Sequence, residues 1–281
     1  MAEFSAADVA ALRKTTGAGM MDCKQALTEC DGDMDAAKDW LRTKGLAGAS
    51  KRAARAAENG AVDVVVDGGV GAIVEVTAET DFVAKSGDFT GTVAALARLA
   101  VEAGTDELAA LEHEGSTVGE HVTQLAARLG ENVAVGRVIV LEATDGVLDG
   151  YKHVQSERGT IGVLVDLGGV DPNDPHAREV AHDIALHIAS AAPRYLTRED
   201  VPADVLDKER AVFEELTRNE GKPEQAIPKI IEGRLNGFYK DTVLTEQAFV
   251  KDPKQTVAKV VAGLSPEAHV RRFARVKIGE D

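Results

Sequence analysis

Apolar and polar positions along the chain predict a helical beginning, followed by a mixture of strands and helices. A capping box with a hydrophobic staple over residues 4–9 starts the first helix, and glycine-containing breaks separate it from two more. The stretch after Gly45 is rich in Ala, Lys and Arg, which are good helix formers. The pattern therefore predicts three short helices and a basic helical connector, at about residues 5–14, 20–29, 33–44 and 46–60.

Strand-like segments follow the connector. Two of them flank Asp67-Gly68-Gly69, which is a β-hairpin signal. A helix with its apolar residues on one stripe comes next, and another helix and a further strand follow it. The expected strands are residues 61–66, 72–76 and 132–141, and the expected helices are about 88–103 and 117–129.

The same order of elements then recurs. Residues 162–166 resemble residues 72–76, and each segment leads through a loop into an Ala-rich helix, the second at about 175–191. This recurrence predicts two related α+β subdomains that lie side by side. A final strand is expected at residues 270–278.

Residues 200–239 have a different pattern. Apolar residues seven apart predict two helices that turn at residues 221–223 and form a protruding antiparallel hairpin. Pro228 fits the second helix only if that helix begins near Ile227, because proline is tolerated in the first turn. The expected fold class is α+β, with domains at residues 1–55, 56–140 and 141–281, the last containing the hairpin at about 200–240.

The segment that most suggests a function is residues 75–85, where alternating apolar positions give way to a polar loop. This loop holds Phe82 beside Asp81, in a chain with only seven Phe, three Tyr and one Trp among 281 residues. Thr80 and Asp81 can hold a tight turn through local hydrogen bonds, and Asp88 is a candidate N-cap for the next helix. Phe82 either staples the loop to the core or is offered to a partner.

Composition narrows the class of partner. The chain has 32 Lys and Arg against 47 Asp and Glu, a formal net charge of −15, which repels nucleic acid and anionic membranes. No signal-peptide pattern and no apolar run of membrane-spanning length occur, so we expect a cytoplasmic protein. Cys23 and Cys30 lie two helical turns apart, too far along the helix axis for an easy disulfide, and we expect two thiols.

Motifs for catalysis or cofactor binding do not occur in the sequence. A phosphate-binding loop is absent, and Gly69-Val-Gly71 lacks the third glycine of a dinucleotide site. Residues 31–42 begin like a calcium loop but end on Arg42, where a bidentate carboxylate is required. His182 and His187 are five apart on a helix and point in different directions. No cofactor, no metal and no enzymatic activity are expected.

Several separated segments resemble the bacterial elongation factor Ts family, the guanine-nucleotide exchange factors for elongation factor Tu. Residues 12–27 are similar to the N-terminal signature of the family, and residues 75–85 to its second signature, with Thr80-Asp81-Phe82-Val83 intact. Shorter matches follow in the family's order over nearly the whole chain, at residues 130–132, 161–165, 187–190 and 232–235.

The resemblance implies a ubiquitin-associated-like three-helix N-terminal domain, a core of two related subdomains and an inserted helical hairpin. It implies that Arg13, Met20 and Met21 dock on the nucleotide-binding domain of elongation factor Tu. His153 would contact another domain of that partner. From the residues alone, either Met could instead fill the small helical core, and His153 could face solvent.

The resemblance also implies a mechanism. Thr80, Asp81, Phe82 and Val83 would enter beside the partner's nucleotide, displace its Mg²⁺ and so release GDP, without covalent chemistry. The factor would bind the partner in its GDP-bound and nucleotide-free forms. The alternative is an adaptor that binds a protein partner through the three-helix domain, with the core as a scaffold. Many family members carry a further C-terminal helical segment, so we expect part of the partner contact to be absent or replaced in this chain.

Overall fold

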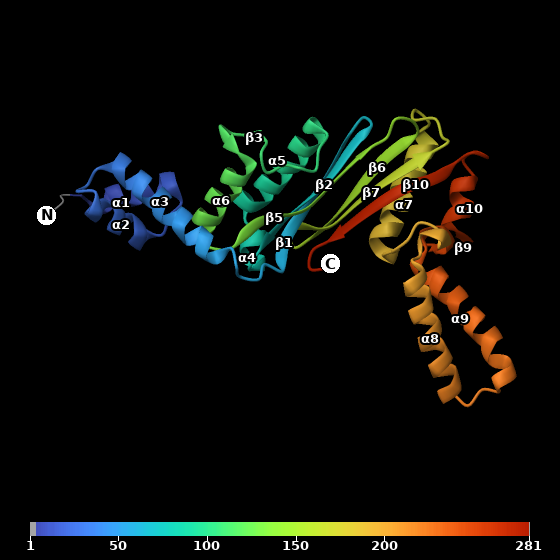
Figure 1. The fold of residues 1–281 in the computed structure, drawn as a ribbon. Coiled ribbons are helices and arrows are strands. Elements are labelled where there is room, and N and C mark those ends of the chain that lie inside the picture. The colour runs from blue at the N-terminus through green and yellow to red at the C-terminus, as the bar shows by residue number, and fades with distance from the viewer. Residues whose placement is uncertain (1–3, 281) are drawn as a thin grey trace.

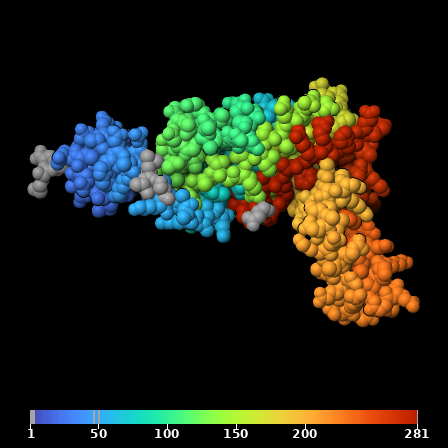
Figure 2. Space-filling model, viewed as in Figure 1, coloured from blue at the N-terminus to red at the C-terminus, as the bar shows by residue number. Residues whose placement is uncertain are grey.

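Strands and helices are combined in this protein as in other α+β folds. The computed structural model describes residues 4–280 (Figure 1), without the side chains at positions 46, 47 and 50 (Figure 2). Helices at the N-terminal end lead into two three-stranded sheets that are covered by helices, and a pair of helices projects near the other end. The predicted α+β class is confirmed. Among the described residues, no helix combines the length and apolar character needed to cross a membrane.

The N-terminal helices enclose a small apolar core of their own. They are α1 (Ala6–Thr16), α2 (Met20–Glu29) and α3 (Met34–Arg52). The predicted capping box is present, because the Ser5 hydroxyl accepts from the Asp8 N–H at 3.3 Å and the Asp8 carboxylate accepts from the Ser5 N–H at 2.7 Å. Both cysteines are free thiols. The core of this module consists of Val9, Leu12, Cys23, Ala26, Leu27, Ala37 and Leu41.

Helix α3 runs further than the sequence pattern predicts. Gly45 does not end it, and the predicted connector is helical only as far as Arg52. A Cβ at Gly45 would lie 3.0 Å from the Cβ of Ala127 on α6 (Val118–Leu129), so the glycine permits close helix packing. The Arg52 guanidinium also donates to the Ala126 carbonyl at 3.3 Å. The long α3 therefore attaches the N-terminal module to the core.

The first sheet joins the predicted hairpin to a third strand. Strands β1 (Asn59–Asp67), β2 (Val70–Ala78) and β5 (Val133–Glu142) pair in the order β1-β2-β5, all antiparallel. Helix α5 (Gly87–Ala103) packs on β1 and β2, and α6 packs on β5. Their apolar faces share one core, which includes Val74, Val76, Phe89, Val93, Leu96 and Leu125.

The second sheet has the same order of elements. Strands β6 (Val147–Gln155), β7 (Arg158–Gly168) and β10 (His269–Lys277) pair antiparallel, with β7 in the centre. Helix α7 (Pro175–Ala191) packs on β6 and β7, and α10 (Val257–Ala262) lies against β10. In both sheets a hairpin, a covering helix and a third strand follow one another.

The two sheets pack face to face, with helices on both outer faces (Figure 1). A separate apolar layer fills the space between them, and it consists of Val62, Ile73, Leu141, Leu148, Leu164 and Val276. Two glycines bring the sheets close together. A Cβ at Gly150 would lie 2.7 Å from Val64, and one at Gly162 would lie 2.8 Å from Ile73. Any side chain at these two positions would force the sheets apart.

The projecting pair consists of α8 (Ala203–Asn219) and α9 (Ile227–Thr242), which pack against each other (Figure 1). Helix α9 begins at Ile227 with Pro228 in its first turn, which is the only arrangement that the sequence analysis expected for this proline. The small core of the pair contains Ile227, Ile231 and Leu235, with Phe213 and Tyr239 against it. Val212 and Leu216 on α8 remain exposed.

Some elements are absent from the predictions. Sequence reasoning missed strand β6 as a whole, and it missed the short helix α10. It also missed two small hairpins, β3 (Glu112–His113) with β4 (Ser116–Thr117) and β8 (Ala248–Phe249) with β9 (Asp252–Thr256), and three 3₁₀ turns at Arg198–Asp200, Glu224–Ala226 and Leu244–Glu246. Segments of two to six residues carry too little periodicity to be recognised.

A buried histidine gives the second half of the protein a pH-dependent stability. His187 on α7 is buried, its Nε2 lies 2.9 Å from Gln247 Oε1, and its Nδ1 accepts from the Val250 N–H at 3.2 Å. Burial lowers the pKa of His187, and the hydrogen bond to Gln247 opposes this only in part. The unfolded chain therefore takes up this proton first, and stability falls as the pH drops below about 6.5.

We expect His187→Gln to flatten this dependence, because the amide can accept from Val250 and donate to Gln247 without titrating. The measurement is the melting temperature at pH 7.5 and at pH 5.5. Between these two values the melting temperature of the wild type should fall by a few °C more than that of the variant. The exposed His176→Gln serves as the matched control. Equal losses in all three proteins would show that His187 does not carry the effect.

Candidate functional site

The predicted polar loop at residues 80–85 is a single helical turn. Strand β2 ends at Ala78, and α4 (Asp81–Ala84) begins three residues later. Thr80 is its N-cap, since the Thr80 hydroxyl accepts from the Val83 N–H at 3.3 Å. The tight turn was predicted, but its helical form was not, because one turn is too short to show a helical period.

A carboxylate just before β5, the strand that pairs with the end of β2, braces this turn. Glu131 accepts from the Thr80 N–H at 3.0 Å and from the Thr80 hydroxyl at 2.6 Å. Next to it, Glu79 accepts from the Asn132 N–H at 2.7 Å, and its carbonyl accepts from the Asn59 side chain at 3.0 Å. The residues before α4 are thus held on two sides by four hydrogen bonds, three of them to carboxylates.

Phe82 projects from this braced turn. Its side chain is 83% exposed, whereas Ala84 is buried and Val83 packs against the core of the first sheet. The Ser86 hydroxyl donates to the Val83 carbonyl at 2.8 Å and caps α5, so the prediction of Asp88 as the N-cap was wrong. The interpretation of Phe82 as a staple is wrong as well, because Val83 and Ala84, and not Phe82, attach the turn to the core.

Asp81 is held as a carboxylate beside Phe82. Lys85, one turn further on, forms an ion pair with Asp81. The hydrogen bond from Lys85 keeps the pKa of Asp81 below its ordinary value, and Arg158 adds a smaller electrostatic contribution in the same direction. At neutral pH, α4 therefore presents one large apolar ring and one negative charge.

The predicted docking residues are also at the surface. Met20 and Met21, at the start of α2, are 55% and 74% exposed, so neither fills the helical core. Arg13, in the last turn of α1, is exposed. His153 lies exposed on β6 with its Nδ1 3.0 Å from the Tyr151 hydroxyl.

Sequence reasoning missed one exposed apolar neighbour of His153. Val154 is 56% exposed, and a valine in a strand gives no signal of this kind in the sequence. It also missed the role of Glu131, which is visible only once the fold brings it to Thr80.

The predicted residues do not gather in one pocket. They lie on separate elements: α1 and α2 in the N-terminal module, α4 at an end of the first sheet, and β6 in the second sheet (Figure 1). Such a spread suits a large partner that covers several surfaces, and it does not suit a small ligand.

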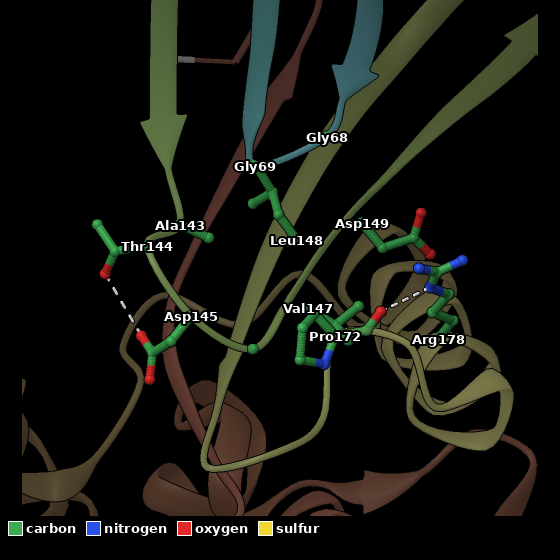
Figure 3. Close-up of a pocket in the computed structure, with 11 residues that line it drawn as sticks. Gly68, Gly69, Ala143, Thr144, Asp145, Val147, Leu148, Asp149, Pro172 and Arg178 are labelled. Atoms are coloured by element: carbon green, nitrogen blue, oxygen red, sulfur yellow. Dashed lines mark hydrogen bonds between the residues drawn. The ribbon is translucent and has the colours of Figure 1, made fainter.

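A cleft elsewhere in the core is a weaker candidate site. It has a volume of about 520 Å³ and is lined by the β1–β2 turn, the β5–β6 connection, Pro172 and Arg178 (Figure 3). Its charged groups are already satisfied. Asp145 pairs with Arg271 at 2.6 Å, Asp149 contacts His182 at 3.0 Å, and Arg178 donates to the Pro172 carbonyl at 2.9 Å. Asp145, Asp149 and Arg178 thus each already have a hydrogen-bond partner in the protein, which makes this cleft the weaker candidate.

Comparisons with known proteins agree with the geometry. Residues 79–280 match the family model described as "Elongation factor TS". Proteins named elongation factor Ts are 48% identical in Micrococcus luteus, with 99% of this chain and 100% of the relative covered, and 48% identical in Acidothermus cellulolyticus, with both chains covered in full. The relative in Rhodospirillum rubrum is 46% identical, over all of this chain and 94% of its own length. This chain belongs to the elongation factor Ts family.

Proposed function

We propose that this chain releases GDP from elongation factor Tu by inserting α4, with Thr80, Asp81, Phe82 and Val83, beside the partner's bound nucleotide. As a member of its family, the chain is a translation elongation factor and acts as a nucleotide exchange factor for elongation factor Tu. The proposal concerns the residues that do this work. The partner would be bound in both its GDP-bound and its nucleotide-free form.

The observation that carries the proposal is the exposure of Phe82 on a rigid turn. A phenylalanine that is 83% exposed contributes little hydrophobic free energy to the free protein. Burial of its ring against a partner would provide that free energy on binding. Because Glu131 and Ser86 fix the backbone on either side, little conformational freedom is lost on binding. An exposed, pre-organised aromatic of this kind is the usual form of an interface hot spot.

Asp81 and Phe82 would act together. Phe82 would wedge between elements next to the nucleotide site, and the Asp81 carboxylate would disturb the water ligands of the bound Mg²⁺. A thousandfold faster release of GDP requires a barrier lowered by about 4 kcal/mol, which one buried aromatic with its surrounding contacts can supply. Because coupling between sites is reciprocal, nucleotide binding would in turn loosen the factor.

Docking would use surfaces separate from α4. The N-terminal module, as a ubiquitin-associated-like domain, would place Arg13, Met20 and Met21 on the nucleotide-binding domain of the partner. His153 and its neighbour Val154 would contact a second domain. The exposure of all five residues supports this assignment.

The proposed domains follow from the same scheme. They are residues 1–55, 56–140 and 141–281, the last with α8 and α9 as an antiparallel hairpin inserted at about 200–240. The equal order of strands and helices in the two sheets supports a core of two related subdomains.

The adaptor alternative is not favoured. It would use the N-terminal module and leave the exposed Phe82 without a role, and the family match covers the residues that hold α4. The net charge of −15 argues against nucleic acid as a direct partner. We place the activity in the cytoplasm, with no covalent step and no cofactor of its own.

The proposal predicts that this chain accelerates the release of a fluorescent GDP analogue from elongation factor Tu by several hundredfold or more. Asp81→Ala should slow the accelerated release by roughly tenfold, since it removes a charge and leaves the ring in place. The measurement is single-turnover release against excess unlabelled GDP, at saturating concentrations of the chain. Release at the intrinsic rate in the presence of the wild-type chain would contradict the proposal and favour the adaptor.

A further inference from the structure

Two histidines and one glutamate meet at the start of α6, away from α4. His113 and Glu114 lie in the β3–β4 hairpin, and His121 lies in the first turns of α6. The His113 and His121 rings meet edge to face with centroids 4.9 Å apart, and His121 Nδ1 lies 3.7 Å from Glu114 Oε2. One ligand atom from each of the three side chains lies within 4.8 Å of the others.

We propose that His113, Glu114 and His121 bind one divalent transition-metal ion, with Zn²⁺ as the ion that fits these donors. Two imidazoles and a carboxylate are a donor set of zinc sites, and a water molecule would complete a tetrahedron. Mg²⁺ and Ca²⁺ prefer oxygen ligands throughout and would bind poorly to two nitrogens. The proposal is independent of the exchange activity.

The three side chains can close around an ion with small movements. With metal to nitrogen distances of about 2.0 Å, ligand atoms in a tetrahedral site lie about 3.3 Å from one another, so each must move by roughly 1 Å. Glu114 is free to do so because its side chain is 69% exposed.

The backbone of the hairpin is unusual in a way that agrees with this role. Glu114 has a φ of 50° and Gly115 a φ of 81°, so both central residues of the turn are left-handed. Such turns favour Asn or Asp before Gly, and a glutamate there is unfavourable without a compensating contact. A bond from Glu114 to a metal ion would provide that contact.

The ion would fasten the hairpin to the first turns of α6. This helix has 12 residues and a length of about 18 Å, and its other end leads to Glu131, which braces Thr80. The metal site would therefore stabilise the helix that links the N-terminal module to α4, without touching α4 itself. Its role would be structural, and its loss would lower the melting temperature.

The test uses the full chain after treatment with a chelator. Titration with Co²⁺, followed by its visible absorption, is expected to show one tetrahedral site per chain, from which Zn²⁺ displaces Co²⁺. Zn²⁺ at about 100 times its dissociation constant should raise the melting temperature by roughly 5 °C. His113→Gln and His121→Gln should each weaken binding by about 100-fold or more, and Glu114→Gln by less.

His176→Gln is the matched control. His176 Nδ1 also lies 3.7 Å from a carboxylate, that of Glu179, but His176 is not part of the cluster of possible metal ligands found among the described residues. It should leave the affinity unchanged. The absence of a tetrahedral Co²⁺ spectrum in the wild type would overturn the proposal. So would affinities in the His113→Gln and His121→Gln proteins equal to that of the wild type, since the ion would then be bound elsewhere.

Discussion

Phe82→Ala is expected to slow GDP release from elongation factor Tu by about 100-fold at saturating concentrations of the chain. This corresponds to about 2.7 kcal/mol of lost transition-state stabilisation, the range for an aromatic hot spot. Docking should change little, because Arg13, Met20 and Met21 lie on other elements. The variant should fold with nearly unchanged stability, since an 83% exposed side chain contributes little to the core.

The matched control for this variant is Val250→Ala, which truncates an exposed apolar side chain far from α4 in the sequence. It should release GDP as fast as the wild type. The plateau rate is read from single-turnover traces at increasing concentrations of the chain, so that weak docking is not mistaken for slow displacement. A Phe82→Ala plateau within a factor of two of the wild type would move the mechanism to the docking surfaces.

Elements with strong local signals were predictable from the sequence. The capping box at Ser5, the Gly68-Gly69 turn and the helix that begins at Pro175 all have chemistry that acts within a few residues, and the structure confirms them. Ile227 and Pro228 belong to the same group, since the ring of proline restricts where its helix can start.

Two errors in the predicted fold occur at glycines whose role depends on distant parts of the chain. The sequence pattern ends the third helix before Gly45 and predicts no strand around Gly150, yet α3 and β6 both continue through these glycines. In each case a distant element needs the missing side chain: Ala127 approaches Gly45, and Val64 approaches Gly150. Tertiary packing of this kind has no local signal, which is why β6 was missed altogether.

The candidate site was predictable in its residue types and not in its geometry. The sequence singled out Asp81 and Phe82 but left open whether the ring is buried, because the answer depends on Glu131, which lies 51 positions after Thr80. His113 and His121 were missed for the same reason. Eight positions apart, they meet only because a hairpin folds against the start of α6.

The methionines of α2 give the second large effect. Met20→Ser with Met21→Ser is expected to raise the concentration of the chain needed for half-maximal GDP release by roughly 100-fold. Two methionines that become buried against a partner contribute about 3 kcal/mol together, and serine at the start of a helix preserves the fold. The plateau rate should stay that of the wild type, because α4 is unaltered.

The control for this pair is Val212→Ser with Leu216→Ser on α8, which removes two exposed apolar side chains of similar size. The proposal expects no change of the half-saturating concentration there. The two experiments separate the parts of the mechanism, because Phe82 should act on the plateau and the methionines on the concentration dependence. If the methionine variant instead lowered the plateau and left the half-saturating concentration alone, α2 would take part in displacement, and the division between docking and wedge would be wrong.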